Sequence, residues 1–517
     1  MKKFLSFLVR RLSALSVVFM ILGPSHAQTN DRAASLLRQS LEAQGGEQKL
    51  RAIKTVQWDA FGYRNEVEES ERPEGPYVTE FNTLSEIHDF SGNRYRTTTQ
   101  LEIYPVVRVK TGTVVVDGVG MRLAGDRQMA ATAQEVELVR ERVALNPERV
   151  LLTALNASDV HAEADTVLQS VPQNVIGFTL NNAPVRIYLN AYTHLPTAVD
   201  YSGPLARSSY WAYMGDVTMR TYYSFWWLTK GGLHLPMQWN IERNGLAEEE
   251  VVIRKLRIDE PLDEASLTIP AEVRAKFDPN APAVGPGTVP LGNPTEPAQE
   301  LAPGIVFIPG SWNATLVRQD DGIVILEAPI SPEYAAKVIA EAKRRFPEKP
   351  IKGVITTSDS WPHIAGVREY VAQGIPIYAL DLNHPILDRM IAAPHTENPD
   401  DLQRRPQRPQ FRLVKEKMSL GTGTNRIEIY PLRGETSERQ MMVYWPEHRL
   451  LYGSDSFQTQ GDRFFFPQEV TELMDAVKRE HLQVDRFFMM HIGPTPWSEL
   501  GKAVSAAELQ DSPDGTL

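Results

Sequence analysis

The 517-residue chain contains no cysteine. This absence excludes disulfide bonds, a cysteine nucleophile, a cysteine metal ligand and lipid attachment through an N-terminal cysteine. Positive charge is also scarce, because 54 Lys and Arg stand against 65 Asp and Glu and give a formal net charge of −11. An acidic chain without a basic stripe is a poor partner for nucleic acid, so we expect no nucleic-acid binding.

Long apolar segments are missing except for a short run near the N-terminus. Residues 12–22 follow a basic start that includes Arg10 and Arg11, and they precede small residues that end at Ala27. This pattern predicts a secretory signal over residues 1–27, cleaved after Ala27. An uncleaved anchor is the alternative, but 11 apolar residues fall short of the roughly 20 that a spanning helix needs. We therefore expect a periplasmic or secreted protein with no stable membrane span after cleavage.

The remaining chain is long enough for two packed domains. A β-rich N-terminal domain is expected over residues 28–277, where a short helix stops at Gly45-Gly46 and β-branched strands follow, interrupted by a helix at 133–155. Residues 278–303 hold seven prolines and predict a stiff linker. Residues 304–505 alternate strands and helices, and residues 506–517 form a tail. The fold class is therefore α+β.

Aromatic residues gather at two places late in the first domain. The interpretation that we favour is the packed face of a sheet, and the alternative is a groove that carries a lipid-like or other apolar ligand. The two clusters are Tyr210, Trp211 and Tyr213, and then Tyr222, Tyr223, Phe225, Trp226 and Trp227.

The first domain loosely resembles the β domain of periplasmic lipoprotein carriers over residues 31–272. The resemblance rests on the opening helix that ends in Gln44-Gly45-Gly46, on the run of strands, and on the closing segment at residues 256–262. It implies a curved antiparallel half-barrel with helices and one concave apolar face.

The second domain carries a segment with the spacing of a metal-binding motif. Strands are expected at 304–308, 314–318, 323–327, 351–356, 375–380, 426–431, 441–445, 449–453 and 486–491, and helices at 332–345, 362–373 and 467–479. A polar loop is expected at 395–410. After the strand at 351–356 comes Thr357-Ser358-Asp359-Ser360-Trp361-Pro362-His363. Asp455 and His491 follow two later strands.

These features resemble the metallo-β-lactamase superfamily over residues 303–505 and imply an αββα sandwich. The family motif is T-H-x-H-x-D-H, so two metal-binding histidines are serines here, the aspartate is Pro362, and His363 survives. Glu435 or Thr436 takes the place of the family's third histidine, and the choice between them stays open. Asp455 matches the bridging aspartate and His491 the last histidine.

The resemblance therefore implies a single-metal site held by His363, Asp455 and His491. Two histidines and one carboxylate suit zinc and also iron. Such an ion activates water for hydrolysis of a small-molecule substrate, with Glu435 or Asp359 as general base. One alternative is an inactive scaffold or ligand-binding protein without metal. The other is an apolar-ligand carrier that acts through the N-terminal domain. Substrate and oligomeric state stay open.

Overall fold

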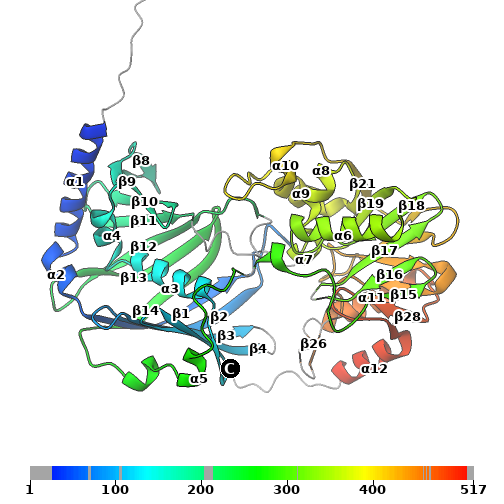
Figure 1. Cartoon of the computed structure of the whole chain (residues 1–517), viewed down its shortest axis with the longest axis horizontal. Helices are drawn as coiled ribbons and strands as arrows, with labels where there is room; N and C mark the ends of the chain where they lie inside the picture. The colour runs from blue at the N-terminus through cyan, green and yellow to red at the C-terminus, as the bar shows by residue number, and fades with distance from the viewer. Residues whose placement is uncertain are drawn as a thin grey trace, which may run out of the picture.

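The computed structural model describes residues 26–67, 72–103, 107–202, 214–283, 285–310, 312–457, 459–460, 463–464 and 467–508. Two lobes lie side by side, the N-terminal one built on a single large sheet and the C-terminal one on two sheets (Figure 1). The predicted signal lies outside the described residues except for His26 and Ala27, where helix α1 begins. No helix in the described part of the chain is long and apolar enough to cross a membrane.

A curved antiparallel sheet forms the N-terminal lobe and has 14 strands among the described residues. Its order is β6-β5-β4-β3-β2-β1-β14-β13-β12-β11-β10-β9-β7, with β8 paired to β9. The strands are β1 (Thr55–Asn65), β2 (Thr79–Asp89), β3 (Arg94–Ile103), β4 (Val107–Val116), β5 (Val119–Ala124), β6 (Arg127–Ala130), β7 (His161–Ala162), β8 (Thr166–Leu168), β9 (Val171–Leu180), β10 (Ala183–Asn190), β11 (Pro196–Tyr201), β12 (Met219–Leu228), β13 (His234–Arg243) and β14 (Leu246–Ile258).

Helices cover one face of this sheet and form a hydrophobic core with it. Helix α1 (His26–Ala43) carries Ala33, Leu37 and Leu41 on one stripe, and all three are buried against the sheet together with residues of α2 (Glu47–Ala52) and α4 (Val150–Asn156). Gly45 ends the α1 segment at a φ of 118°, and a Cβ there would clash with the carbonyl of Gly232. Helix α3 (Ala133–Leu145) packs on β4, and α5 (Ala271–Arg274) lies near β5 and β6.

Two stacked sheets form the C-terminal lobe. The first has the order β15-β16-β17-β18-β19-β20-β21. Its neighbouring strands are antiparallel from β15 through β18 and parallel from β18 through β21. The second sheet has the order β22-β23-β24-β25-β28-β29. Their strands are β15 (Gln299–Ala302), β16 (Ile305–Ile308), β17 (Ala314–Gln319), β18 (Gly322–Leu326), β19 (Ile351–Thr356), β20 (Ile377–Leu380), β21 (Phe411–Val414), β22 (Met418–Leu420), β23 (Ile427–Pro431), β24 (Met441–Trp445), β25 (Leu450–Tyr452), β28 (Arg486–Phe488) and β29 (Thr495–Pro496).

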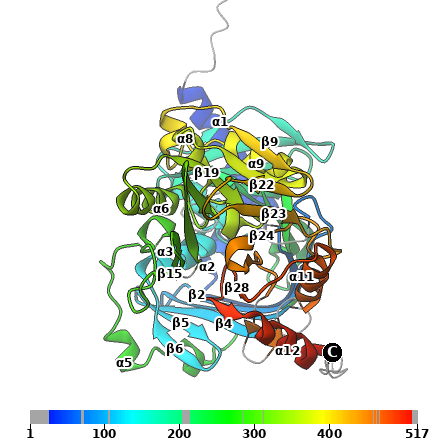
Figure 2. The same cartoon turned by 90° about the vertical axis from the view of Figure 1, so that its right-hand side faces the viewer.

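Helices enclose the two sheets from both sides and complete an αββα sandwich. One apolar cluster, including Phe307 and Trp445, fills the space between the sheets. A second cluster joins the first sheet to α6 (Pro332–Arg345), α8 (Val367–Ala372), α9 (His384–Ala392) and α10 (Asp401–Arg404). A third joins the second sheet to α11 (Pro467–Arg479) and α12 (Trp497–Glu508). Helices α6 and α11 accordingly lie on opposite sides of the sheets (Figure 2).

Several predicted elements have the observed bounds, and others differ for local reasons. Helices α6 and α11 and strands β19 and β24 match their predicted limits. The single helix expected at 133–155 is two helices, because Pro147 cannot continue α3. The predicted linker ends in β15, the edge strand of the sandwich, and the polar loop at 395–410 contains α10. Strands β21 and β22 and helices α9 and α12 were not predicted.

Among the described residues, contacts at two places join the lobes. Arg72 and Glu74, between β1 and β2, form ion pairs of 2.7 and 3.2 Å with Glu438 and Arg439 of the sandwich. At the second contact the Asp216 backbone N–H donates to the carbonyl of Pro394 at 2.7 Å. These contacts hold the N-terminal lobe against two loops of the sandwich.

Candidate functional site

Glu327 lies at the inner end of the candidate site. It follows β18 directly, with a φ of 71°, and its backbone N–H donates to the carbonyl of Ile355 on the neighbouring β19. The side chain is 1% exposed, and it accepts hydrogen bonds from the hydroxyl and the backbone N–H of Thr357. Because β18 and β19 are parallel, their carboxyl ends meet here and bring Glu327 and Thr357 together.

His363 sits between two carboxylates. It belongs to the short helix α7 (Trp361–Ile364) and is fully buried. Its Nδ1 is 3.0 Å from Glu327 Oε2, a close but poorly aligned ion pair, and its Nε2 is 2.9 Å from Asp455 Oδ2. Burial disfavours the charged imidazole, yet the charges of Glu327 and Asp455 outweigh burial and raise the pKa of His363 to about 10.

Asp455 and His491 carry the site outward to the surface. Asp455 follows β25, and its Oδ1 is 3.5 Å from His491 Nε2. The His491 side chain is 31% exposed, whereas that of Asp455 is 13% exposed. Asn313 positions this end, because its backbone N–H and side-chain amide donate to the carbonyls of Met490 and Met489. The order from core to solvent is therefore Glu327, His363, Asp455 and His491.

Asp359 lies at the side of this row. It is 8% exposed, and burial raises the pKa of its carboxyl to about 7, against the opposing charges of Arg439 and His363. A carboxyl group with that pKa exchanges a proton near neutral pH. Arg439 also pairs with Glu74 of the N-terminal lobe, so the lobe contact reaches the surroundings of Asp359.

Glu435, the other predicted base, lies away from the row. Its side chain is exposed, and its backbone N–H donates to Glu472 Oε1 at 2.9 Å. Glu472 also accepts from the backbone N–H groups of Thr436 and Ser437, and so fixes the loop. No contact within the described residues joins the Glu435 side chain to His363, Asp455 or His491. The structure thus brings together the three predicted ligands and leaves Glu435 and Thr436 outside.

Three buried groups of the site had no role in the sequence-based prediction. These are Glu327, Thr357 and Tyr452, and the Thr357 hydroxyl, which donates to Glu327, is also hydrogen-bonded to Ser454 Oγ at 2.8 Å. The pKa of Tyr452 is raised by burial and by the nearby carboxylates Glu327 and Asp455. The available signal was a carboxylate at the end of a buried apolar strand, where desolvation demands a partner.

The donor set suits one metal ion, although its spacing is that of ion pairs. No group of three or more His, Asp or Glu side chains in the described ranges is arranged to hold a metal ion. Two imidazoles and a carboxylate are nevertheless the atoms that zinc or iron prefers. A carboxylate facing the remote nitrogen of a ligand histidine, as Glu327 faces His363 Nδ1, is also common at metal sites. An ion would have to replace the proton between His363 and Asp455.

No protein-family model and no curated protein matches the sequence. Among solved structures, the DIM-1 metallo-β-lactamase has a TM-score of 0.33 and 15% identity, covering 43% of this chain and 98% of that one. A metallo-β-lactamase from Pontibacter korlensis has a TM-score of 0.33 and 14% identity, covering 41% and 99%. The sec-alkylsulfatase Pisa1 from Pseudomonas sp. has a TM-score of 0.31 and 14% identity, covering 42% and 40%. Likeness at this level says nothing about activity.

Proposed function

We propose that the chain is an exported hydrolase whose αββα lobe binds one divalent metal ion, zinc or iron, through His363, Asp455 and His491. The observation that carries the proposal is the meeting of three segments far apart in the chain, because His363 Nε2 and His491 Nε2 each face one of the two carboxylate oxygens of Asp455. Two carboxylates around a buried imidazole need a positive charge between them. Either a proton on the imidazole or a metal ion bound to it can supply that charge.

In this proposal the residues of the site have separate roles. Glu327 holds the His363 ring from the inner side, so that Nε2 faces Asp455. His491, the most exposed of the three ligands, opens the site to a substrate from solvent. Asp359, with its pKa near 7, accepts or returns a proton. A bound ion would supply Lewis acidity and lower the pKa of a water molecule toward about 7.

A second function is favoured by the same pairing of His363. With both ring nitrogens beside carboxylates, the imidazolium is satisfied without metal, and the row is then a structural ion network in an inactive scaffold. The two functions differ in one measurable quantity, which is the metal content of the protein.

Elemental analysis of the full chain, purified without chelator and again after loading with zinc or ferrous iron, tests the proposal. We expect about one equivalent of metal in the wild type, and none in His363→Ala/His491→Ala. His481→Asn, which changes an exposed histidine outside the site, should keep the full equivalent. Metal in the wild type would justify assays with ester, lactam, lactone and phosphodiester substrates. No metal after loading would overturn the hydrolase proposal and favour the scaffold.

A further inference from the structure

Three β-hairpin turns lie at the same end of the N-terminal sheet. They join β8 to β9, β10 to β11 and β12 to β13, which are neighbouring strands. The first two turns are linked, because the Ala191 backbone N–H donates to the carbonyl of Pro172 at 3.0 Å. The β10–β11 turn lies beside the end of β12, because Ala198 pairs with Tyr222 in antiparallel register. Together the three turns form the hairpin end of the lobe.

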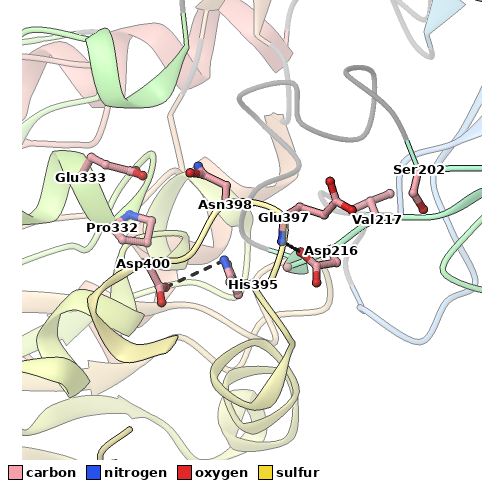
Figure 3. A pocket seen from close by; sticks show the side chains of 10 residues that line it. Ser202, Asp216, Val217, Pro332, Glu333, His395, Glu397, Asn398 and Asp400 are labelled. Atoms are coloured by element: carbon pink, nitrogen blue, oxygen red, sulfur yellow. Dashed lines mark hydrogen bonds and ion pairs between the residues drawn. The ribbon is translucent and has the colours of Figure 1, made fainter. Parts of the chain in front are cut away.

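The sandwich contacts the opposite end of these strands. Asp216, shortly before β12, accepts a hydrogen bond from the backbone N–H of Glu397 at 2.9 Å (Figure 3). The ion pairs of Arg72 and Glu74 with the sandwich also lie at that end, between β1 and β2. In the described part of the chain the sandwich therefore leaves the hairpin end uncovered.

Large apolar side chains are exposed at the hairpin end. Eight large hydrophobic side chains are exposed among the described residues, and five of them lie in or directly beside these turns, with exposed fractions of 59 to 75%. The five are Val167, Tyr192, Phe225, Trp227 and Leu228. The other three lie on β1 and β2, where Arg254 lies over the ring of Phe61 and Tyr63 donates to Glu250. A gathering of exposed apolar side chains marks an interaction surface.

The hairpin end carries no negative charge, although the chain has 65 Asp and Glu. Residues 166–171, 190–195 and 224–233 contain neither of them, and Asp165, directly before β8, is paired with Arg32 at 2.6 Å. Lys230 is exposed in the β12–β13 turn, and the ammonium group of the exposed Lys49 lies beside Gly232 of the same turn. The turns therefore carry only positive charge, in a chain whose formal net charge is −11.

A lipid bilayer fits this combination better than a protein does. Tyrosine and tryptophan favour the membrane–water interface, where the ring meets apolar atoms and its polar group stays hydrated. Lysines beside such side chains are attracted to anionic headgroups. Lipids also adapt to separate turns that project from a sheet, whereas a protein partner needs a surface of complementary shape.

We propose that the hairpin end docks the protein on the surface of an anionic lipid bilayer, with Tyr192, Trp227 and Leu228 among the headgroups and with Lys49 and Lys230 near the phosphates. The sandwich then lies on the side of the N-terminal lobe that faces away from the bilayer. Docking does not depend on metal at the Glu327–His491 row, because that row belongs to the sandwich.

Vesicle flotation tests the proposal with residues 28–517, the form expected after cleavage, because the apolar run at 12–22 would itself bind lipid. This form keeps the whole N-terminal core, whose first residue is Ala33. We expect it to float with vesicles of phosphatidylcholine that contain about one third phosphatidylglycerol. Tyr192→Ala/Trp227→Ala should lower the bound fraction at least fivefold. The matched control Phe61→Ala/Phe81→Ala removes two exposed aromatic rings from β1 and β2 and should change it less than twofold.

Four outcomes would overturn it. Three are no flotation of the unaltered protein, equal binding by the hairpin-end variant, and equal loss in the control pair, which would indicate unspecific adsorption of exposed rings. The fourth is self-association without vesicles in sedimentation velocity, abolished in Tyr192→Ala/Trp227→Ala, which would assign the hairpin end to a second copy of the chain. Both pairs replace exposed side chains, and circular dichroism verifies that each variant is folded.

Discussion

Glu327 and His363 form an ion pair of 3.0 Å in which neither side chain is more than 1% exposed. Glu327 directly follows β18, whereas His363 belongs to α7, the helix that follows β19. The pair therefore connects the first sheet to α7. Removal of the Glu327 carboxylate takes one of two partners from a charged ring that water does not reach, and His363 keeps only Asp455, at 2.9 Å.

Replacing Glu327 should destabilise the sandwich strongly. Removing one partner of a buried ion pair costs about 3–5 kcal/mol, so we expect Glu327→Ala to lower the free energy of unfolding by that amount. Glu327→Gln, which keeps the shape and one acceptor, should cost less. Chemical denaturation followed by tryptophan fluorescence measures the change. Glu348→Gln, at an exposed carboxylate, should stay within about 0.5 kcal/mol. A loss below 1 kcal/mol in Glu327→Ala would contradict a buried charge pair.

Local sequence patterns predict part of this architecture well. Helix α6 has Ser331 as N-cap, Pro332 at its start and an apolar stripe, and its predicted bounds are the observed ones. Such signals lie within one element, so they are readable without knowledge of tertiary contacts. The same holds for β24, a short apolar run between polar turns.

Contacts between distant elements are less accessible from one sequence. The meeting of His363, Asp455 and His491 was predicted only through resemblance, and the partner of His363 on its inner side was not predicted, because no local pattern says which strand ends are neighbours. The contact between Asp216 and Thr396 joins residues 180 positions apart in the chain, and it follows from how two lobes pack.

Asp359→Asn should stabilise the protein at high pH. Burial raises the pKa of Asp359 to about 7. The folded chain therefore holds a proton that the unfolded chain loses near pH 4, and stability falls as pH rises from about 4 to 7 and stays lowered above. We expect Asp359→Asn to gain about 2–4 kcal/mol at pH 8 and little at pH 4.5. Denaturation at the two pH values measures it. If Asp359 moves a proton in catalysis, the same variant loses turnover. An unchanged stability at pH 8 would show that the carboxylate is solvated.

The N-terminal lobe should lose stability in alkaline solution through His88. This fully buried histidine lies 2.9 Å from Glu86 and 3.1 Å from Glu148, and these carboxylates outweigh burial and raise its pKa to about 9. A raised histidine pKa stabilises the fold fully below about pH 6.5 and no longer above the folded pKa. Between pH 6.5 and 9.5 we expect a loss of about 2–3 kcal/mol.

In His88→Gln the slope of stability against pH over that interval should flatten, because the titrating group is gone. The variant should be less stable than the wild type at pH 6.5, since Glu148 and Glu86 then lose the imidazolium between them and Glu86 keeps only Arg142, at 2.6 Å. A slope that persists in His88→Gln would assign the alkaline loss to another group.

Two neighbouring tryptophans of β12 allow a test of whether this face of the sheet is a packed core or a groove for an apolar ligand. Trp226 is partly buried against the core of the N-terminal lobe, with its ring 6.3 Å from that of Tyr223, whereas Trp227 is 66% exposed. Because α1, α2 and α4 already fill that face, we expect Trp226→Ala to cost about 2 kcal/mol of stability, and Trp227→Ala less than about 0.5. Denaturation compares the two variants, and organic extraction with mass spectrometry measures apolar molecules that co-purify. Lipid bound to the wild type and lost in Trp226→Ala, with stability unchanged, would instead indicate that this face carries a ligand.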